Sequence, residues 1–387
     1  MQRDKVTLLF NANKEYDRQI LKGIGHYLHS TRPNWELFLE EDFRCRLDSI
    51  AKWRGEGVIA DFDDSLIREA LADSDSPIVA IGGSYRDGKA YPEVPYVATD
   101  NTALVESAFF HLKQLGLERF AFFGMPKTGA PNWAIEREDA FRQVLDTQGY
   151  TYDVFRGSST DVENWQKLLN DLVDWLSRLA KPVGIIAVTD VRARYLIQAC
   201  QKAELLVPDD ISIIGIDDDE LARSLSTISI SSVKQGCFNM GYQAAKLLDQ
   251  VLNGRKLSGA PILVAPEGVI ARQSTAFRDL ADPVAKQAMH YIRLHAIRGI
   301  KVAQVANYLG ISRTKLEQRF ISAMGHSVHQ ELHNQKLMQA CEMLKTTSEN
   351  IEEVARSCGY SSKQYLSAVF QRHFNLTPLK FRELNKV

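Results

Sequence analysis

The C-terminal part of the chain contains the same short pattern twice. The first copy reads VAQVANYLGISRTKLEQRF over residues 302–320, and the second reads IEEVARSCGYSSKQYLSAVFQRHF over residues 351–374. Each copy has an apolar helical face, a turn glycine (Gly310 or Gly359), a serine and a second segment with apolar residues at helical spacing. Two helices joined by such a turn form a helix-turn-helix, which presents one helix to the DNA major groove. The repeat therefore predicts an all-α domain with two DNA-binding motifs.

The side chains that face DNA follow from the helical spacing. Leu316 and Phe320 in the first motif, and Leu366 and Phe370 in the second, lie at i and i+4 and are expected to point inward. Arginine reads guanine and glutamine reads adenine in the major groove, whereas basic residues such as Lys315 hold phosphates. The predicted base-facing residues are Arg313, Thr314, Glu317, Gln318, Lys363, Gln364, Ser367 and Gln371. Arg319, Arg372 and Lys380 are further candidates for phosphate contacts.

The charge of the chain is distributed unevenly. The 387 residues carry 47 Lys and Arg and 48 Asp and Glu, for a net charge of -1. Residues 283–387 hold 15 of these basic residues and 7 of the acidic ones. The remainder of the chain holds 32 basic and 41 acidic residues. A basic module that coincides with the repeated motif, attached to an acidic body, is typical of a DNA-binding domain joined to a domain that does not bind DNA.

Composition limits the class of protein. A length of 387 residues predicts two or three domains, and 45% apolar with 25% charged residues is typical of soluble globular proteins. No run of eighteen apolar residues predicts a membrane span, and the N-terminal apolar run is too short for a signal peptide. The five cysteines are scattered without a CxxC pair, which favours reduced thiols and a cytoplasmic protein.

The first two-thirds of the chain alternates strand-like and helix-like segments. Expected strands cover residues 6–10, 36–39, 57–60, 78–81, 96–98, 120–124, 185–188, 211–215 and 228–231. Expected helices cover residues 18–29, 47–53, 65–72, 103–115, 137–146, 166–179, 192–202 and 238–252. This alternation predicts an α/β fold with two successive parallel-sheet lobes and a cleft between them. The predicted divisions are a two-lobed domain over residues 1–272, a linker over 273–284 and the DNA-binding domain over 285–387.

Polar loops follow several of the expected strands. Ligands of open parallel sheets bind beyond the carboxyl ends of the strands. Asn13, Asp61, Asp190 and Asp217 lie in these loops, and carboxylates and amides hydrogen-bond sugar hydroxyls while an aromatic face such as that of Trp133 covers a sugar ring. The alternative is that each Asp or Asn merely caps the helix that follows it. Capping explains the polar residues of a single loop well, but it explains less well why several polar loops converge at one edge of the sheet.

The C-terminal motifs resemble those of the arabinose-regulator (AraC) family of transcription activators. The resemblance covers residues 285–384 and rests on the Gly-Ile-Ser and Gly-Tyr-Ser turns, the helix over residues 312–320 and the ending TPLKFR. It implies a double helix-turn-helix domain that binds double-stranded promoter DNA and, by analogy with the family, acts on RNA polymerase.

The front part resembles the sugar-binding cores of the lac-repressor family and of periplasmic ribose-binding proteins. The resemblance rests on Asp100-Asn101, Glu136-Arg137-Glu138, Thr189-Asp190, Gly215-Ile216-Asp217-Asp218 and Val233-Lys234-Gln235; most lac-repressor members have Asn at position 189. It implies a two-lobed, periplasmic-binding-protein-like (type I) ligand domain. Together with loop position, it gives a predicted sugar site formed by Asn13, Asp61, Trp133, Arg137, Asp190, Asp217 and Gln235.

The pairing of these two parts, together with the runs VIADFDD (residues 58–64) and TDVRAR (residues 189–194), resembles the xylose-operon transcription activators of enterobacteria. The resemblance implies D-xylose or a related pentose as effector and no cofactor. We hypothesise that the sugar closes the two lobes, as in hinged binding proteins, and that closure changes the geometry of a homodimer to favour operator binding. Membrane association is not expected.

Two other functions are compatible with parts of the sequence. Paired carboxylates such as Asp61 and Asp217 suit a glycosidase-like enzyme, and a purely structural front domain would leave only DNA binding. The phosphate-loop-like run at residues 83–90 has Ala90 where Ser or Thr binds Mg²⁺, and the histidines at 326, 329 and 333 lack ligands to complete a metal site. A DNA-binding regulator controlled by a sugar therefore accounts for more of the chain than an enzyme does.

Overall fold

The structure is a computed structural model that describes residues 3–39, 50, 52–53, 55–255, 260–277, 280 and 282–385. It divides into two compact units, an N-terminal unit Met1–Phe277 and a C-terminal unit Arg278–Val387. The predicted linker, residues 273–284, includes the 3-10 turn η2 (Gln273–Thr275), whose Ser274 and Thr275 are buried in the N-terminal unit.

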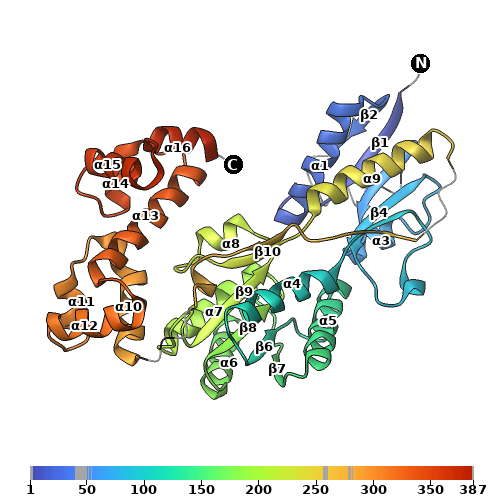
Figure 1. Cartoon of the computed structure of the whole chain (residues 1–387). Helices are drawn as coiled ribbons and strands as arrows, with labels where there is room; N and C mark the ends of the chain where they lie inside the picture. Colours follow the sequence, from blue (N-terminus) through green and yellow to red (C-terminus); the bar gives the residue numbers. More distant parts are fainter. Residues whose placement is uncertain are drawn as a thin grey trace. The chain divides into compact units, whose positions relative to one another are not determined.

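The N-terminal unit contains two six-stranded sheets, each in its own lobe (Figure 1). The sheet of lobe 1 has the order β11-β5-β4-β3-β1-β2, with all its neighbours parallel. Its strands are β1 (Asp4–Leu9), β2 (Trp35–Phe38), β3 (Gly57–Asp61), β4 (Ile78–Gly83), β5 (Tyr96–Thr99) and β11 (Ile262–Val264). Its helices are α1 (Glu15–Thr31), α3 (Ser65–Ala70), α9 (Cys237–Leu252) and the 3-10 turn η1 (Gly88–Ala90).

Lobe 2 repeats this arrangement with the order β12-β10-β9-β8-β6-β7, in which only the β10–β12 pair is antiparallel. Its strands are β6 (Phe120–Phe123), β7 (Tyr152–Phe155), β8 (Val183–Ala187), β9 (Ile211–Ile216), β10 (Ser231–Lys234) and β12 (Gly268–Ile270). Its helices are α4 (Asn101–Gln114), α5 (Asn132–Gln148), α6 (Trp165–Arg178), α7 (Asp190–Lys202) and α8 (Glu220–Ser224). The central strands β3, β8 and β9 are buried along their whole length, as expected for parallel strands covered on both faces.

The two lobes are joined by segments far apart in the sequence. In the described residues the chain passes between the sheets three times: after β5, between β10 and α9, and between β11 and β12. Helix α9 consequently packs in the core of lobe 1, although the strands before it belong to lobe 2. Connecting segments of this kind are where hinge motion between two lobes occurs.

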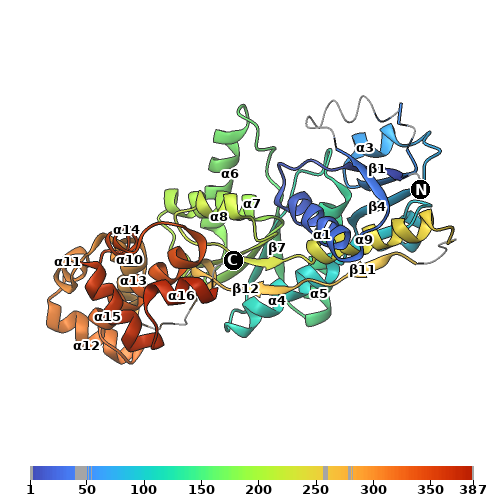
Figure 2. The ribbon, with the colours of Figure 1, turned by 90° about the horizontal axis from the view of Figure 1, so that it is seen from above.

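Helices α1 and α9 lie side by side on lobe 1 in both Figure 1 and Figure 2. Glycines permit this close approach. A Cβ placed on Gly241 would lie 2.0 Å from the carbonyl oxygen of Ile20, and one on Gly23 would lie 1.9 Å from that of Phe238. The obstacle in both cases is backbone, which cannot move aside as a flexible side chain can.

We predict that Gly241→Ala destabilises the N-terminal unit by about 2 kcal/mol or more, because overpacking forces the helices apart. All five tryptophans lie before residue 278, so urea unfolding followed by tryptophan fluorescence reports on this unit alone. Gly25→Ala in α1 is the matched control, since a Cβ there meets nothing within 4 Å. The control should be neutral or stabilising by up to ~1 kcal/mol, the difference in helix propensity. Equal effects of both substitutions would contradict this account of the contact.

The C-terminal unit is all helical, as the repeated motif predicts. Its elements are α10 (Pro283–His295), η3 (Ala296–Arg298), α11 (Val302–Tyr308), α12 (Arg313–Met324), α13 (Val328–Thr346), α14 (Ile351–Ser357), α15 (Lys363–Phe374) and α16 (Pro378–Asn385). The two turns between the paired helices are equivalent, because Gly310 and Gly359 both have positive φ, 63° and 70°. Glycine adopts this conformation without the strain that a Cβ introduces.

Helix α13 belongs to two hydrophobic cores. Its first turns pack with α10, α11 and α12, while its later turns pack with α14, α15 and α16. With 19 residues it spans roughly 28 Å, the scale of one turn of DNA. Helix α13 therefore joins the two helix-turn-helix motifs. None of the helices in the described ranges is long and apolar enough to cross a membrane.

Some sequence predictions were wrong in detail. The strand predicted over residues 228–231 begins only at Ser231. Ile228 and Ile230, whose apolar side chains suggested a strand, are instead buried in the loop that leads into β10. Helix α5 begins at Asn132, not at Arg137, since Pro131 occupies its N-cap. The short elements β7, α8, β11 and β12 were not predicted. The helix predicted over residues 47–53 lies mostly outside the described residues.

Candidate functional site

A cavity of about 330 Å³ lies between the two lobes of the N-terminal unit. We call it the inter-lobe cavity. Its walls come from the segments that follow β1, β3 and β4 in lobe 1, and from α5 and the segments that follow β8 and β9 in lobe 2. This is the edge at which ligands of parallel sheets bind. Six of the seven predicted sugar-site residues line it: Asn13, Asp61, Trp133, Arg137, Asp217 and Gln235.

Asp190 is the predicted residue that does not line the inter-lobe cavity. It is 2% exposed and lies behind the wall, where its carboxylate accepts hydrogen bonds from Ser232 Oγ (2.7 Å) and from the backbone N–H of Asp219 (2.7 Å). Burial, followed by the charge of Asp217, raises the pKa of Asp190 well above its usual range. Asp190 therefore positions the turn that carries Asp217, whose φ of 120° is rare outside glycine.

Arg137 is the centre of a hydrogen-bond network at the cavity wall. From α5 its Nη1 donates to the Val188 carbonyl (2.8 Å) and its Nε to Asn101 Oδ1 (3.1 Å). The same Nη1 lies 3.7 Å from Asp217 Oδ1, and the guanidinium lies 4.8 Å from the centre of the Trp133 ring. The side chain is almost fully buried, so these contacts replace the water that a charge of this kind requires.

The network extends to lobe 1 through an amide. Gln235 Nε2 donates to Asp217 Oδ1 (2.5 Å), and Gln235 Oε1 accepts from Thr99 Oγ1 (3.0 Å). Burial raises the pKa of Asp217 to about 6, and the charge of Arg137 opposes the shift. Asp217 is therefore mostly ionised at neutral pH and offers acceptor oxygens to hydroxyl groups.

Lobe 1 contributes a second group of carboxylates. Asp61 Oδ2 lies 3.6 Å from Lys14 Nζ, but burial raises the pKa of Asp61 despite this attraction. Asp63 accepts from the backbone N–H of Gly83 (2.9 Å), and burial together with the charge of Asp61 raises its pKa to about 7. At a pH close to its pKa, a carboxyl group is partly protonated and can either donate a hydrogen bond to a hydroxyl group or accept one from it.

Asp17 lies directly behind these carboxylates and is fully buried. Within the described residues, neither of its carboxylate oxygens has a hydrogen-bond partner of standard geometry. Burial and then the charge of Asp61 raise its pKa to about 8, and Lys14 and the Asn11 backbone offset the shift only in part. Tyr16 lines the cavity, and its hydroxyl likewise has no partner in the described part of the chain.

Because the folded pKa of Asp17 exceeds its unfolded value near 3.9, the folded state binds the proton more tightly. The associated stability is complete below pH 4 and is lost as the pH rises through about 8. We predict that the melting temperature of the N-terminal unit falls between pH 6 and pH 8.5.

Asp17→Asn should flatten this fall, because the amide does not titrate. The expected gain at the upper pH is about 1 kcal/mol or more, a rise of roughly 2–4 °C. Asp174→Asn, at an exposed position on α6, is the control and should leave the pH dependence unchanged. A profile with the same slope in wild type and in Asp17→Asn would contradict the burial of an uncompensated carboxyl group.

Sequence reasoning missed part of this cavity. Lys14, Asp63, Thr99 and Asn101 line it as well, together with Thr189 and the exposed Leu221. Lys14 and Asp63 stand next to predicted loop residues, so counting every polar residue of those loops would have found them. Thr99 is a strand residue with an ordinary sequence environment, and only the fold places it there.

The two helix-turn-helix motifs have matching local structure. The hydroxyls of Ser312 and Ser362 cap α12 and α15, accepting from the N–H of Lys315 and Tyr365, both at 3.2 Å. Leu316 and Phe320 in α12, and Leu366 and Phe370 in α15, are fully buried, which confirms the predicted inward face. The predicted outward residues that are exposed are Arg313, Thr314, Gln318, Lys363, Gln364 and Gln371.

Two of the predicted base-facing residues are half-buried. Glu317 Oε2 accepts from the backbone N–H of Val328 (3.1 Å) at the start of α13, and Ser367 is partly covered. Arg319, expected at a phosphate, forms an ion pair with Asp282 (2.7 Å), the N-cap of α10. Tyr365 is an exposed aromatic residue on α15 that sequence reasoning did not include.

Known protein families match three successive parts of the chain. Residues 5–102 match the XylR N-terminal domain, residues 109–275 the periplasmic binding protein-like domain and residues 305–384 a helix-turn-helix domain. The xylose operon regulatory protein of Escherichia coli K12 is 51% identical over 99% of this chain and 98% of its own length. The protein of that name from Haemophilus influenzae is 45% identical over 98% of both chains.

The chain belongs to the xylose operon regulatory protein family. Among solved structures, one described as the xylose-binding transcription activator xylR covers all of this family member with a TM-score of 0.90 and 49% identity. A periplasmic binding protein/LacI transcriptional regulator from Alkaliphilus metalliredigens, solved in complex with D-xylulofuranose, matches 71% of this chain and 99% of its own at a TM-score of 0.55 and 19% identity. That second likeness shows the fold alone. The regulator family and the predicted two-domain fold class are thereby confirmed.

Proposed function

We propose that this protein is a transcription activator of pentose catabolic genes that binds D-xylose in the inter-lobe cavity and promoter DNA through α12 and α15. The observation that carries the proposal is full-length identity of 51% to a xylose operon regulatory protein, in a chain whose inter-lobe cavity is lined by hydrogen-bonding side chains. Membership in a family of transcription regulators favours this function over the glycosidase-like alternative.

The chemistry of the inter-lobe cavity suits a small neutral polyol. Asp217, Asn13 and Gln235 supply acceptors and donors for paired hydroxyl groups, and Arg137 supplies donors in a fixed plane. Trp133 offers an aromatic face to the C–H side of a sugar ring. Sites with a few well-placed polar groups discriminate strongly against a ligand that leaves them unpaired.

Sugar acts on DNA binding through the lobes. A ligand that contacts both walls of the inter-lobe cavity binds the closed form more tightly, and only this difference in affinity shifts the population. Closure then alters the surface that each protomer offers to its partner in a homodimer. The dimer brings two C-terminal units to two half-sites of the operator, and the bound activator contacts RNA polymerase in the cytoplasm.

Asp217→Ala removes an acceptor from the site and is predicted to weaken D-xylose binding about 10- to 100-fold, the cost of an unpaired hydroxyl in a buried site. Isothermal titration calorimetry of the full chain measures the change. Asp174→Ala on α6 is the control and should bind as wild type does. Unchanged affinity in Asp217→Ala, with the tryptophan unfolding transition intact, would show that Asp217 does not contact the sugar.

Gln318 and Lys315 provide a matched pair on α12 for the DNA contacts. Gln318→Ala should weaken operator binding by about 1–3 kcal/mol and relax the preference at one base pair. Lys315→Ala should weaken operator and random DNA alike and lower the slope of log K against log salt by about 1. Fluorescence anisotropy with operator and scrambled duplexes separates the two effects, and Gln330→Ala on α13 serves as control. Equal losses on both duplexes for Gln318→Ala would contradict base reading by α12.

A further inference from the structure

A second cavity, of about 540 Å³, lies in lobe 2 beside α5. We call it the α5 cavity. One face of α5 carries Trp133 and Arg137 into the inter-lobe cavity, and the adjacent face lines the α5 cavity. Its volume is within the range of small-molecule sites.

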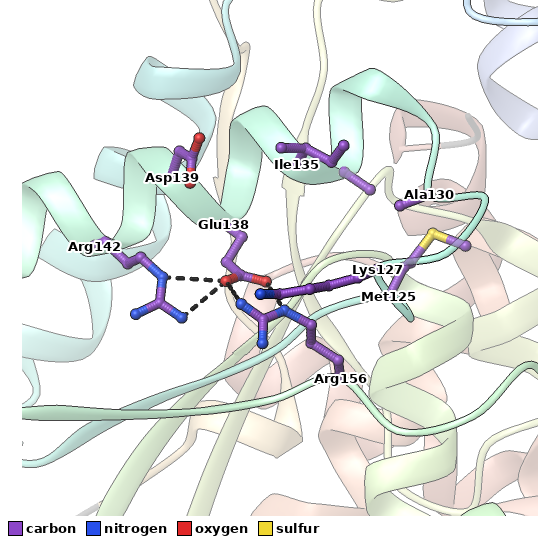
Figure 3. A pocket seen from close by; sticks show the side chains of 9 residues that line it. Met125, Lys127, Ala130, Ile135, Glu138, Asp139, Arg142 and Arg156 are labelled. Atoms are coloured by element: carbon purple, nitrogen blue, oxygen red, sulfur yellow. Dashed lines mark hydrogen bonds and ion pairs between the residues drawn. The ribbon is translucent and has the colours of Figure 1, made fainter.

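Two arginines at this cavity share a single carboxylate. Glu138 Oε1 accepts from Arg142 Nε (3.1 Å) and Nη2 (2.9 Å), and Glu138 Oε2 accepts from Arg156 Nε (2.7 Å). Figure 3 shows the Glu138 carboxylate between the two guanidinium groups, with the Lys127 side chain extending toward them. Burial alone would raise the pKa of Glu138, but hydrogen bonds from Arg156 and Arg142 lower it, so the carboxylate is ionised.

The balance of charge in the α5 cavity is positive. Asp139 forms an ion pair with Arg86, with 3.8 Å between Oδ2 and Nη1. Arg86 itself does not line the α5 cavity. Lys127 has no ion-pair partner in the part of the chain that the structure describes. The negative charge of Glu138 thus neutralises the charge of one arginine. The positive charges of the second arginine and of Lys127 are left without a compensating negative charge. Guanidinium and ammonium groups that converge in this way favour a phosphate or a carboxylate.

The position of Arg156 is fixed from behind. Arg192 is buried, with its guanidinium 4.8 Å from the centre of the Phe123 ring. Its Nη1 donates to the Arg156 carbonyl (3.1 Å) and its Nη2 to the Ser158 carbonyl (3.4 Å). The buried guanidinium of Arg192 therefore holds the backbone at Arg156 in place. The Arg156 side chain then needs little rearrangement when an anion binds, which lowers the entropy cost of association.

The remaining wall of the α5 cavity is apolar. Met125, Ala130, Ala134 and the half-exposed Ile135 supply it. An inorganic ion would fill only the cationic end and leave this wall to water. A ligand with a charged group and an apolar body would use both parts.

We propose that the α5 cavity is a second ligand site, which takes a small organic anion with an apolar body and which strengthens sugar binding in the inter-lobe cavity. The anionic group, a phosphate monoester or a carboxylate, lies among Lys127, Arg142 and Arg156. The apolar body contacts Met125 and Ile135.

The two cavities are connected by the segment between β6 and α5. Lys127 and Ala130 in this segment line the α5 cavity, and Trp133, three residues later, lines the inter-lobe cavity. An anion that ties Lys127 to Arg156 restricts the segment before a sugar arrives. Trp133 then loses less freedom when it packs on the sugar, so the sugar binds more tightly. This part of the inference rests on the proposed function, whereas the binding site itself does not.

Direct binding is tested by calorimetry with phenyl phosphate as probe, benzoate as the carboxylate probe and phenol as the uncharged comparison. Wild-type full-length protein should bind one or both anions and not phenol. Lys127→Ala and Ile135→Glu should each weaken binding about tenfold or more, since one removes a charge-assisted contact and the other places a negative charge at the site.

Both positions tolerate substitution, because Lys127 has no ion pair to lose and Ile135 is 46% exposed. Lys167→Ala on α6 and Val162→Glu, at a position 95% exposed in the same lobe, are matched controls and should bind as wild type does. Failure of both anions to bind at about 10 mM, or binding that Lys127→Ala and Ile135→Glu leave unchanged, overturns the site.

Coupling is tested by titrating D-xylose with and without saturating phenyl phosphate. D-xylose should bind several-fold more tightly in its presence, and phenyl phosphate should gain affinity by the same factor when D-xylose is saturating. An unchanged D-xylose affinity overturns the coupling. If D-xylose does not bind even in the absence of phenyl phosphate, the proposed function fails, and the direct titration still decides on the α5 cavity.

Discussion

The buried guanidinium of Arg137 connects four parts of the N-terminal unit that are far apart in the sequence. It binds the start of α4 through Asn101, the end of β8 through the Val188 carbonyl, the turn after β9 through Asp217, and its own helix through Trp133. A buried charge is tolerated only where its partners are complete, and removing one partner leaves the other uncompensated. The shape of the inter-lobe cavity therefore depends on this side chain.

The cavity wall is also rich in carboxyl groups. Asp61, Asp63 and Asp217 face the cavity, Asp17 lies behind it, and burial raises the pKa of all four. Arg137 and Lys14 are the cations that line the inter-lobe cavity in the described part of the chain. A neutral polyol offers hydroxyls to these oxygens without adding charge, whereas an anion would meet further repulsion. The arginine-rich α5 cavity has the opposite preference, so one helix separates two sites with different ligand chemistry.

The sequence predicted most of this organisation because its strongest signals are local. The repeated turn around Gly310 and Gly359 identified the C-terminal unit, and the spacing of Leu316 and Phe320 gave the correct buried face. Loop position and family resemblance placed Arg137, Asp217 and Gln235 at one cavity.

What could not be predicted depends on contacts between distant segments. The burial of Asp190 behind the cavity wall, the ion pair of Arg319 with Asp282 and the contact of Glu317 with α13 each involve a partner that sequence spacing does not show. The α5 cavity joins α5 to residues after β6 and β7 for the same reason. Short strands such as β11 and β12 lack enough residues to display a periodicity, and they form because a neighbouring strand is already in place.

The most direct measurement of the role of Arg137 is a double-mutant cycle with Arg137→Met and Asp217→Asn, read as urea unfolding by tryptophan fluorescence. Arg137→Met alone should cost about 3 kcal/mol or more, because it leaves the half-buried Asp217 carboxylate without a counter-charge and the Val188 carbonyl without its donor. In the Asp217→Asn background the same substitution should cost at least ~1 kcal/mol less, since no charge remains uncompensated. Costs that are equal in the two backgrounds would show that the two side chains do not act together, and the account of the inter-lobe cavity would fail.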